Sequence, residues 1–214
     1  GWNWSGHVHP ASEPETSARA MYALGLAREQ GFTIAADVVS KGVAHLRERF
    51  KVASQDQLER KAILSHALAW NSAGDFGALN RLHRLRNSLS PAALAYTGLA
   101  LAKMERGAMA SEVAALLVPQ ISNVGTIPTK TNLAWSQSQI EMSALASMLL
   151  QITDPGSTAS RNVADYLLNN RPWGSGKARG MAVAAVSQWL GKTQGKVDPY
   201  DVEVTINGNT MLME

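Results

Sequence analysis

Carboxylates near the starts of predicted helices are the first candidates for catalytic chemistry in this sequence. Glu13, Glu15 and Glu141 each lie at or just before the start of an apolar helical segment. Two carboxylates that face each other across a cleft can hydrolyse a glycosidic bond. Carboxylates in the first turn of a helix also interact favourably with the helix dipole, which is the simpler interpretation. We therefore keep a glycosidase as an alternative and assign no catalytic residue.

Histidines offer a second kind of chemistry, because imidazole serves both as a metal ligand and as an acid–base group. His7 and His9 are separated by one residue in a polar stretch, with neither a cysteine nor a pair of carboxylates nearby. An exposed loop is therefore a simpler interpretation than a metal site. His66 lies among apolar residues and is expected to be a hydrogen-bonded core residue, whereas His45 and His83 lie on separate predicted helices. The sequence assigns no metal ligand and no cofactor-binding residue.

The absence of cysteine and the wide spacing of the aspartates exclude further kinds of catalytic site. The chain has no cysteine, which excludes disulfides, thiolate zinc sites and a cysteine nucleophile within these residues. Its aspartates never lie closer together than three positions, so it has no aspartate-rich site for a diphosphate-bound metal. Aromatic rings can bind a sugar or an isoprenoid, but we expect Trp173 and Trp189 to plug the core, and Trp2 and Trp4 to hold a loop. The chain is therefore not expected to be an enzyme.

Composition and charge are those of an ordinary globular protein. Of the 214 residues, 45% are hydrophobic and 17% are charged, and the net charge is only +3. This small surplus gives little support to nucleic-acid binding, and the basic residues between 41 and 86 fit the solvated faces of helices. No stretch approaches the ~20 apolar residues of a membrane-spanning helix. The sequence opens with neither a methionine nor a signal-peptide pattern, so we expect it to be part of a longer protein.

The helices that must position these residues are predicted to be of two kinds. Five segments are apolar nearly all round, as in helices buried on most sides, and they lie within residues 17–27, 62–70, 92–104, 140–152 and 181–190. Amphipathic segments alternate with them, within residues 34–50, 79–85, 113–121 and 163–167. Helical hairpins that recur every ~30–50 residues indicate a solenoid or a closed ring. The apolar layer favours the ring, so we predict an all-α fold: an incomplete α/α toroid with hairpins like those of terpenoid cyclases and prenyltransferases.

Local signals predict where several of these helices begin and end. Gly31 is expected to follow the end of the first helix. Asp75 and Ser90-Pro91 are expected to begin later ones, and Gly191 to end the last. Residues 122–135 form the one long loop of the predicted architecture.

The C-terminus changes from a helical to a strand pattern. Residues 200–206 alternate apolar and polar side chains, as a half-buried strand does. Asn207-Gly208 is a hairpin-turn signal, and residues 210–213 can return beside the first strand. We therefore predict a toroid domain at residues 1–196 and the start of a following β domain at residues 197–214.

Three stretches occur in a recognisable order. Gly1-Trp2-Asn3-Trp4, followed by residues 12–18, leads into an apolar helix. Residues 139–146 contain the run Ile-Glu-Met-Ser-Ala-Leu, and residues 169–178 read Asn-Asn-Arg-Pro-Trp-Gly-Ser-Gly-Lys-Ala. Together with the C-terminal strand, they resemble the thioester-containing, complement-component-like domain of the alpha-2-macroglobulin and complement family, and most closely its bacterial members.

The resemblance implies a helical domain of an endopeptidase inhibitor that traps proteases. In that family a Cys–Gln thioester stores an acyl group that an attacking amine can take, and the toroid shields it. This chain has no cysteine, so the thioester motif either lies upstream of Gly1 in the parent protein or has been lost. The connection at residues 51–55 is short and has no histidine, which favours direct reaction with protease lysines if a thioester exists. No catalytic residue of the family is carried over.

The resemblance also implies partners and a location. Target proteases, bound through the full-length parent, and other domains of the same chain are the expected partners; nucleic acid and membrane insertion are not expected. The location is expected to be extracellular, periplasmic or in the cell envelope. The family's toroid has more helices than are predicted here, so exposed inner-helix surface predicts self-association or modest stability. The alternative is an α/α-toroid enzyme or binding domain for glycan or isoprenoid ligands, which predicts a water-filled funnel lined by facing carboxylates.

Overall fold

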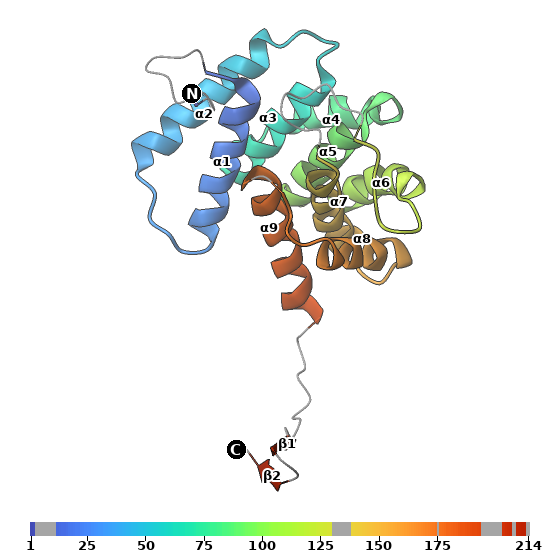
Figure 1. The fold of residues 1–214 in the computed structure, drawn as a ribbon. Helices are drawn as coiled ribbons and strands as arrows, with labels where there is room; N and C mark the ends of the chain where they lie inside the picture. The colour runs from blue at the N-terminus through green and yellow to red at the C-terminus, as the bar shows by residue number, and fades with distance from the viewer. Residues whose placement is uncertain (3–11, 130–137, 175, 194–202, 207–208, 213–214) are drawn as a thin grey trace.

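Nine α-helices and one β-hairpin make up the described part of the chain in this computed structural model (Figure 1). The structure describes residues 1–2, 12–129, 138–174, 176–193, 203–206 and 209–212. The helices are α1 (Pro14–Glu29), α2 (Ala36–Val52), α3 (Leu58–Trp70), α4 (Phe76–Arg84), α5 (Pro91–Lys103), α6 (Gly107–Leu117), α7 (Gln139–Thr153), α8 (Thr158–Asn169) and α9 (Gly176–Thr193). Two short 3₁₀ turns, η1 (Arg86–Ser88) and η2 (Val118–Gln120), follow α4 and α6.

The helices form two layers. The inner layer consists of α1, α3, α5, α7 and α9, and each of these packs against the next in that order. The outer helices α2, α4, α6 and α8 each pack against the two inner helices that precede and follow them in the chain (Figure 1). The predicted alternation of inner and outer helices in an incomplete α/α toroid is therefore confirmed. Because α1 and α9 are the first and last inner helices, they form the two edges of the incomplete ring.

Burial explains why the two kinds of helix have different sequences. Every residue of α5 from Ala92 to Leu101 is buried, and so is every residue of α7 from Glu141 to Gln151. The outer helix α2, by contrast, buries only Gly42 and Leu46. An inner helix contacts both inner neighbours and the outer layer, so it needs apolar or small residues on all sides. Although the inner helices are apolar, none of those described is long and apolar enough to cross a membrane.

The predicted helix starts carry the expected caps. The Asp75 carboxylate accepts the backbone N–H of Ala78 at 3.2 Å, and the Ser90 hydroxyl accepts that of Ala93, also at 3.2 Å. Each contact satisfies one of the backbone donors that the first turn of a helix leaves free. Gly31 has a φ of 84° just after the end of α1, a conformation that favours glycine.

Gly191 does not end the last helix as predicted, because α9 continues through it to Thr193. A glycine inside a helix costs only about 1 kcal/mol relative to alanine, which by itself is too little to end a helix. The predicted long loop begins after η2 with a turn in which the Ser122 and Thr126 hydroxyls lie 2.7 Å apart. Residues 130–137 of that loop lie outside the described residues.

The C-terminal hairpin forms at the predicted position. Strands β1 (Glu203–Ile206) and β2 (Asn209–Leu212) pair antiparallel, with Glu203 opposite Leu212 and Ile206 opposite Asn209. Asn207-Gly208, the predicted turn, lies outside the described residues.

Candidate functional site

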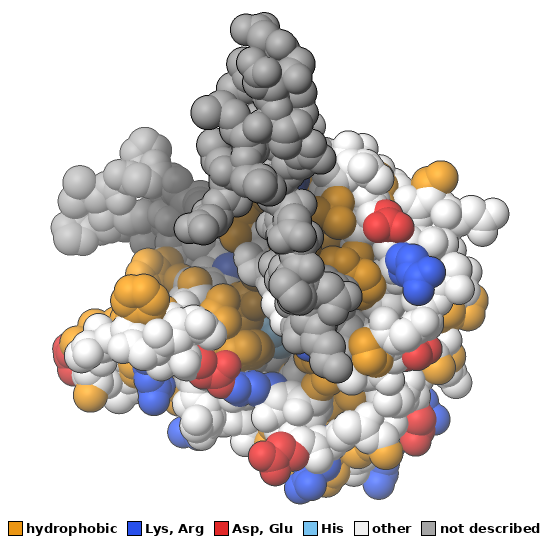
Figure 2. Space-filling view, turned by 90° about the horizontal axis from the view of Figure 1, so that it is seen from below, with side chains coloured by type: hydrophobic (Ala, Val, Ile, Leu, Met, Phe, Trp, Pro, Cys, Tyr) orange, Lys and Arg blue, Asp and Glu red, His pale blue; other side chains and the backbone are white. Residues whose placement is uncertain are grey.

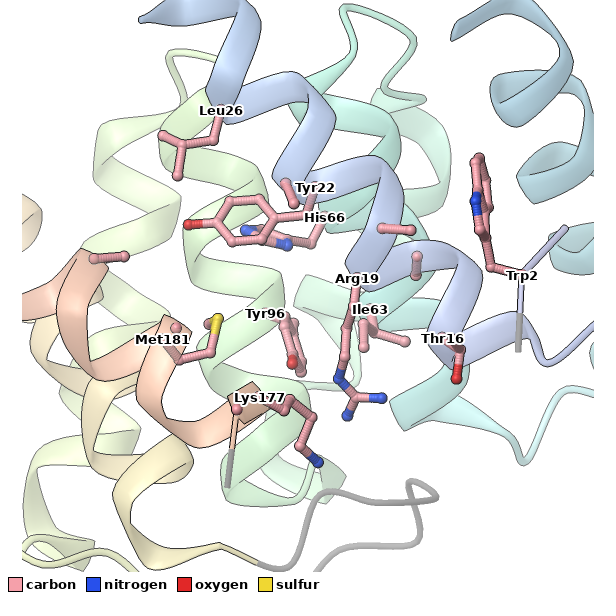
Figure 3. Close-up of a pocket in the computed structure, with 16 residues that line it drawn as sticks. Trp2, Thr16, Arg19, Tyr22, Leu26, Ile63, His66, Tyr96, Lys177 and Met181 are labelled. Atoms are coloured by element: carbon pink, nitrogen blue, oxygen red, sulfur yellow. The ribbon is translucent and has the colours of Figure 1, made fainter. Parts of the chain in front are cut away.

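A pocket opens between the two edge helices, α1 and α9, and we call it the seam pocket (Figure 3). Its volume is about 420 Å³, and residues of α3 and α5 form its floor. The larger side chains that line it are Trp2, Thr16, Arg19, Tyr22, Leu26, Ile63, His66, Tyr96, Lys177 and Met181. Seen from below, the surface is hollowed and apolar side chains gather around the hollow (Figure 2). The pocket is therefore an apolar recess at the edge of the incomplete ring.

Aromatic side chains form the inner wall of the seam pocket and pack into the interior next to it. The ring of Tyr22 lies 4.7 Å from that of His66 and 5.2 Å from that of Trp70, and His66 lies 5.3 Å from Tyr96. The Tyr22 hydroxyl also lies 3.8 Å from the sulfur of Met148, so α1, α3, α5 and α7 all contribute to this cluster. We call Tyr22, His66, Trp70 and Tyr96 the aromatic cluster. It plugs the barrel where the alternative function would require a water-filled funnel.

Burial holds the titratable members of the aromatic cluster in their neutral forms. It lowers the pKa of His66 to about 3, because a charged imidazole would have to leave water. It raises the pKa of Tyr22 to about 12 and raises that of Tyr96 as well. Neutral His66 has rings as its neighbours, so the aromatic cluster contributes packing and supplies no activated base.

One end of the seam pocket carries a group of buried charges. The Glu141 carboxylate at the start of α7 is 1% exposed and lies 3.5 Å from Arg19 Nε and 2.9 Å from Lys177 Nζ. Burial lowers the pKa of Lys177, and the Glu141 carboxylate opposes that shift. Arg19 and Lys177 line the pocket (Figure 3), whereas Glu141 is not among its lining residues. Because two cations share one carboxylate, this end of the pocket carries a positive surplus.

The other predicted carboxylates do not join Glu141 in one cleft. Glu13 accepts a hydrogen bond from the Thr16 hydroxyl at 2.8 Å, and Glu15 pairs with Arg60 at 2.6 Å. Glu15 lines a separate recess of about 270 Å³ that also holds Asp56 and Glu59.

That recess does not supply the proton donor of a glycosidase. Hydrogen bonding from Ser54 lowers the pKa of Asp56 and keeps this carboxyl ionised, and Arg60 neutralises Glu15. A general acid must instead retain its proton near neutral pH. Asp56 and Glu15 are therefore held as charged groups in this recess and do not match the proton donor that hydrolysis needs.

The predicted histidines fall at separate places. The core position of His66 is confirmed, since its side chain is 1% exposed. His45 lies 3.3 Å from the Ser12 hydroxyl, and His83 pairs with Glu112 at 3.1 Å. His7 and His9 lie outside the described residues. Within the described parts of the chain, no group of three His, Cys, Asp or Glu side chains could hold a metal ion.

The described tryptophans agree with their predicted roles only in part. Trp2 lines the seam pocket and donates its backbone N–H to the Ser17 hydroxyl at 2.9 Å, which ties the N-terminus to α1. Trp173 donates its indole N–H to the Leu167 carbonyl at 2.7 Å, beside the end of α8, and Trp189 is half-buried on α9. The aromatic cluster fills the interior in their place. Trp4 and Trp135 lie outside the described residues.

Sequence reasoning missed the two cations of the site. Arg19 is the single charged residue in the apolar segment 17–27, and Lys177 stands at the start of the last apolar helix. An isolated charge in an otherwise apolar helix needs a buried partner, and this signal could have identified both. The resulting geometry can bind an apolar or anionic group.

The fold is similar to that of solved bacterial alpha-2-macroglobulins. Salmonella alpha-2-macroglobulin reacted with methylamine has a TM-score of 0.67 and 18% identity over 94% of this chain. The native conformation of the Escherichia coli protein has a TM-score of 0.65 and 19% identity over 91% of this chain. The trypsin-activated Escherichia coli protein has a TM-score of 0.62 and 17% identity over 84% of this chain.

These likenesses concern the fold of one segment. The chain spans 14% of the length of the Salmonella structure and 13% of each of the two Escherichia coli structures. No protein-family model matches the sequence, and no curated protein matches it. The three-dimensional similarity therefore reaches further than the sequence similarity.

Proposed function

We propose that this chain is a helical, thioester-type toroid domain of a bacterial-type alpha-2-macroglobulin, a protein that traps proteases. The single observation that carries the proposal is the fold likeness to alpha-2-macroglobulins, with TM-scores of 0.67 and 0.62 to the methylamine-reacted and trypsin-activated forms. In this role the chain acts as a rigid body that shields a thioester located elsewhere, if the parent has one. Target proteases and the other domains of the parent are its partners.

The filled interior supports a role in packing rather than in catalysis. The aromatic cluster forms the inner wall of the seam pocket and packs into the interior next to it, and no carboxylate is among the described residues that line the pocket. A rigid body that moves as a unit needs such a close-packed core, because close-packed interiors transmit movement without deforming. We therefore propose that the chain is not an enzyme.

The two edges of the incomplete ring, α1 and α9, suit a helical domain that packs against further helices. We propose that further helices of a complete toroid pack against α1 and α9 at the seam, and that residues 1–196 belong to that toroid. Residues 197–214 then begin a β domain with the hairpin β1–β2. An alpha-2-macroglobulin of this kind works outside the cell, in the periplasm or in the cell envelope.

Retention of trypsin by the full-length parent protein tests the proposal. A trap closes only after the protease has cut it, so active trypsin should co-elute with the parent in size-exclusion chromatography. Trypsin with a chemically blocked active-site serine is the matched control and should elute alone. Co-elution of both forms, or of neither, would contradict the proposal.

The thioester is tested separately by the intact mass of the parent before and after methylamine. A gain of one methylamine together with a newly titratable thiol is expected if the parent carries a thioester. No gain would mean that the trap, if co-elution occurs, is steric rather than covalent.

The apolar lining of the seam pocket favours one second candidate, a binding domain for isoprenoid ligands. Arg19 and Lys177 at the end of the pocket would meet the ligand's diphosphate. Farnesyl diphosphate should then raise the melting temperature of the 214-residue chain, and Lys177→Met should abolish that shift. A melting temperature that farnesyl diphosphate leaves unchanged would remove this candidate.

A further inference from the structure

A second recess, far from the seam, lies where the ends of α2 and α4 meet the start of α3, and we call it the basic groove. Its volume is about 710 Å³. Four cations line it, Lys51, Lys61, Arg81 and Arg84, and Asp75 is the one carboxylate in its described lining. The groove therefore concentrates positive charge in a chain whose net charge is only +3.

Lys61 is the most unusual of these cations. Lys61 is 8% exposed. It is the fourth residue of α3, so its ammonium lies near the positive end of the helix dipole. It donates to the Gln55 side-chain oxygen at 3.2 Å and lies 5.7 Å from the centre of the Phe50 ring. None of the ion pairs found among the described residues includes Lys61, although the Asp56 carboxylate lies close enough to attract it electrostatically. The helix dipole disfavours the Lys61 charge, and an anion in the groove would offset that cost.

The other charged residues of the groove do not supply the anion that would pair with Lys61. Asp75 lies at the N-cap of α4, where it accepts the Ala78 N–H, so it is engaged in holding the helix. Arg81 and Arg84 are exposed, and they stand one turn apart on α4. Their position in the last turn of α4 also suits the dipole of that helix. Solvent exposure and the helix dipole explain why Arg81 and Arg84 are tolerated as charged groups, but they do not explain the charge of Lys61.

Apolar side chains next to the cations point to a partner that is itself a protein. Leu85, which lines the groove, is 47% exposed, and Phe50 and Leu58 line it as well. A nucleic acid would need cations spread along a surface to follow its phosphates. Here the cations converge on a recess that includes the mostly buried Lys61, which suits a compact carboxylate on a short side chain flanked by apolar residues.

We propose that the basic groove docks an acidic segment of a protein, in which Glu or Asp alternates with apolar side chains. One carboxylate of that segment pairs with the Lys61 ammonium. Others accept hydrogen bonds from the guanidinium groups of Arg81 and Arg84, which match carboxylates in a bidentate geometry. The apolar side chains of the segment cover Leu85. This docking site stands independently of the proposed protease-trap function.

A labelled peptide in which glutamate and leucine alternate tests the docking site on the 214-residue chain by fluorescence anisotropy. The peptide should bind, the same peptide with glutamine for glutamate should not, and added salt should weaken binding. Arg81→Glu should weaken binding at least about tenfold, as expected when an interface charge is reversed. Arg161→Glu makes the same charge change at an exposed position on α8 and should leave binding within about twofold of the unchanged chain.

Lys61→Met separates the buried ammonium from the surface charges. It keeps most of the side-chain length, so the chain should fold and its far-ultraviolet circular dichroism should be unchanged. Peptide binding by this variant should be measurably weaker than binding by the unchanged chain. Equal losses for Arg81→Glu and Arg161→Glu would overturn the proposal, because binding would then follow net charge alone. Failure of the peptide to bind, with tight binding of anionic lipid vesicles or a single-stranded oligonucleotide instead, would overturn it as well.

Discussion

At the scale of single residues, Glu141 is a buried carboxylate that faces two cations. Its carboxylate is 1% exposed and faces both Arg19 and Lys177, which are themselves only 11% and 13% exposed. Glu141→Gln would leave two largely buried cations without their anion. We expect it to lower the free energy of unfolding by about 3 kcal/mol, as for other broken buried ion pairs. Urea denaturation at neutral pH measures this change.

Glu112→Gln is the matched control for Glu141→Gln. Glu112 also faces two basic side chains, His83 and Arg86, but it is 52% exposed. Water screens such a pair, so the expected loss is only about 0.5 kcal/mol. Equal losses for the two variants would contradict the burial of the Glu141 group.

The pKa of His66 predicts how stability depends on pH. Burial lowers this pKa to about 3 in the folded state, whereas an exposed histidine in the unfolded chain titrates near 6.5. The unfolded state therefore binds the proton first, and the stability that neutral His66 provides is fully present above pH ~6.5. It falls by about 1.4 kcal/mol per pH unit between pH ~6.5 and pH ~3. His66→Phe removes this titration but keeps a ring in the aromatic cluster.

Urea denaturation at several pH values compares the free energy of unfolding of His66→Phe with that of the unchanged chain. The acid-induced loss of stability should be smaller for His66→Phe than for the unchanged chain, because the other acid-sensitive groups are common to both. Parallel stability curves for the two proteins across this range would show that His66 is not buried as described.

At the scale of helices, two glycines distinguish the packed face of one edge helix from the open face of the other. A Cβ on Gly25 of α1 would lie 2.7 Å from the Trp70 carbonyl oxygen of α3, whereas a Cβ on Gly180 of α9 meets nothing within 4 Å. Gly25→Ala should therefore lower the free energy of unfolding by about 1–3 kcal/mol, because backbone cannot yield to the new methyl group. Gly180→Ala should raise it by about 0.5–1 kcal/mol, the usual helix preference for alanine.

Thermal unfolding of the two glycine variants measures how their stabilities differ from that of the unchanged chain. If Gly180→Ala destabilised the chain as much as Gly25→Ala, the face of α9 at the seam would be covered in the 214-residue chain. That result would contradict an open seam in this chain.

The helices were predictable from the sequence because burial leaves a strong pattern in it. The segment 92–104 has no polar face, and the structure buries Ala92–Leu101 completely. The caps at Asp75 and Ser90 were equally readable, since both side chains accept a helical N–H. The end of α9 was not readable, because the helical cost of a single glycine such as Gly191 is too small to fix where a helix ends.

The site was much less predictable than the helices. Ion pairs such as Arg19–Glu141 join residues more than a hundred positions apart, and their partners depend on which helices become neighbours. The aromatic cluster likewise depends on three-dimensional order, because Tyr22, His66 and Tyr96 come from three different helices. The sequence pointed instead to Trp173, which packs beside the end of α8.

At the scale of the whole molecule, the open seam predicts self-association of the 214-residue chain. Leu26 of α1 lines the seam pocket and is only half-buried, so its apolar surface is available to a second copy. Sedimentation equilibrium should give an average mass that rises with concentration. Leu26→Glu should shift the chain towards monomer, because it places a charge on the apolar edge.

Val124→Glu is the control for this association. Val124 is 69% exposed in the turn after η2, away from the residues that line the seam pocket. It should leave the average mass unchanged. An equal effect of both variants, or a chain that is monomeric at all concentrations, would contradict association through the seam.

The central claim is that this helical domain belongs to a protein that traps proteases, and substrate size tests it most directly. The full-length parent is mixed with a limiting amount of trypsin, and hydrolysis of a small chromogenic peptide and of a large protein substrate is followed side by side. A protease enclosed by a trap should still cleave the small peptide but lose most of its activity on the large substrate. Equal activity on both, or equal loss on both, would contradict the claim.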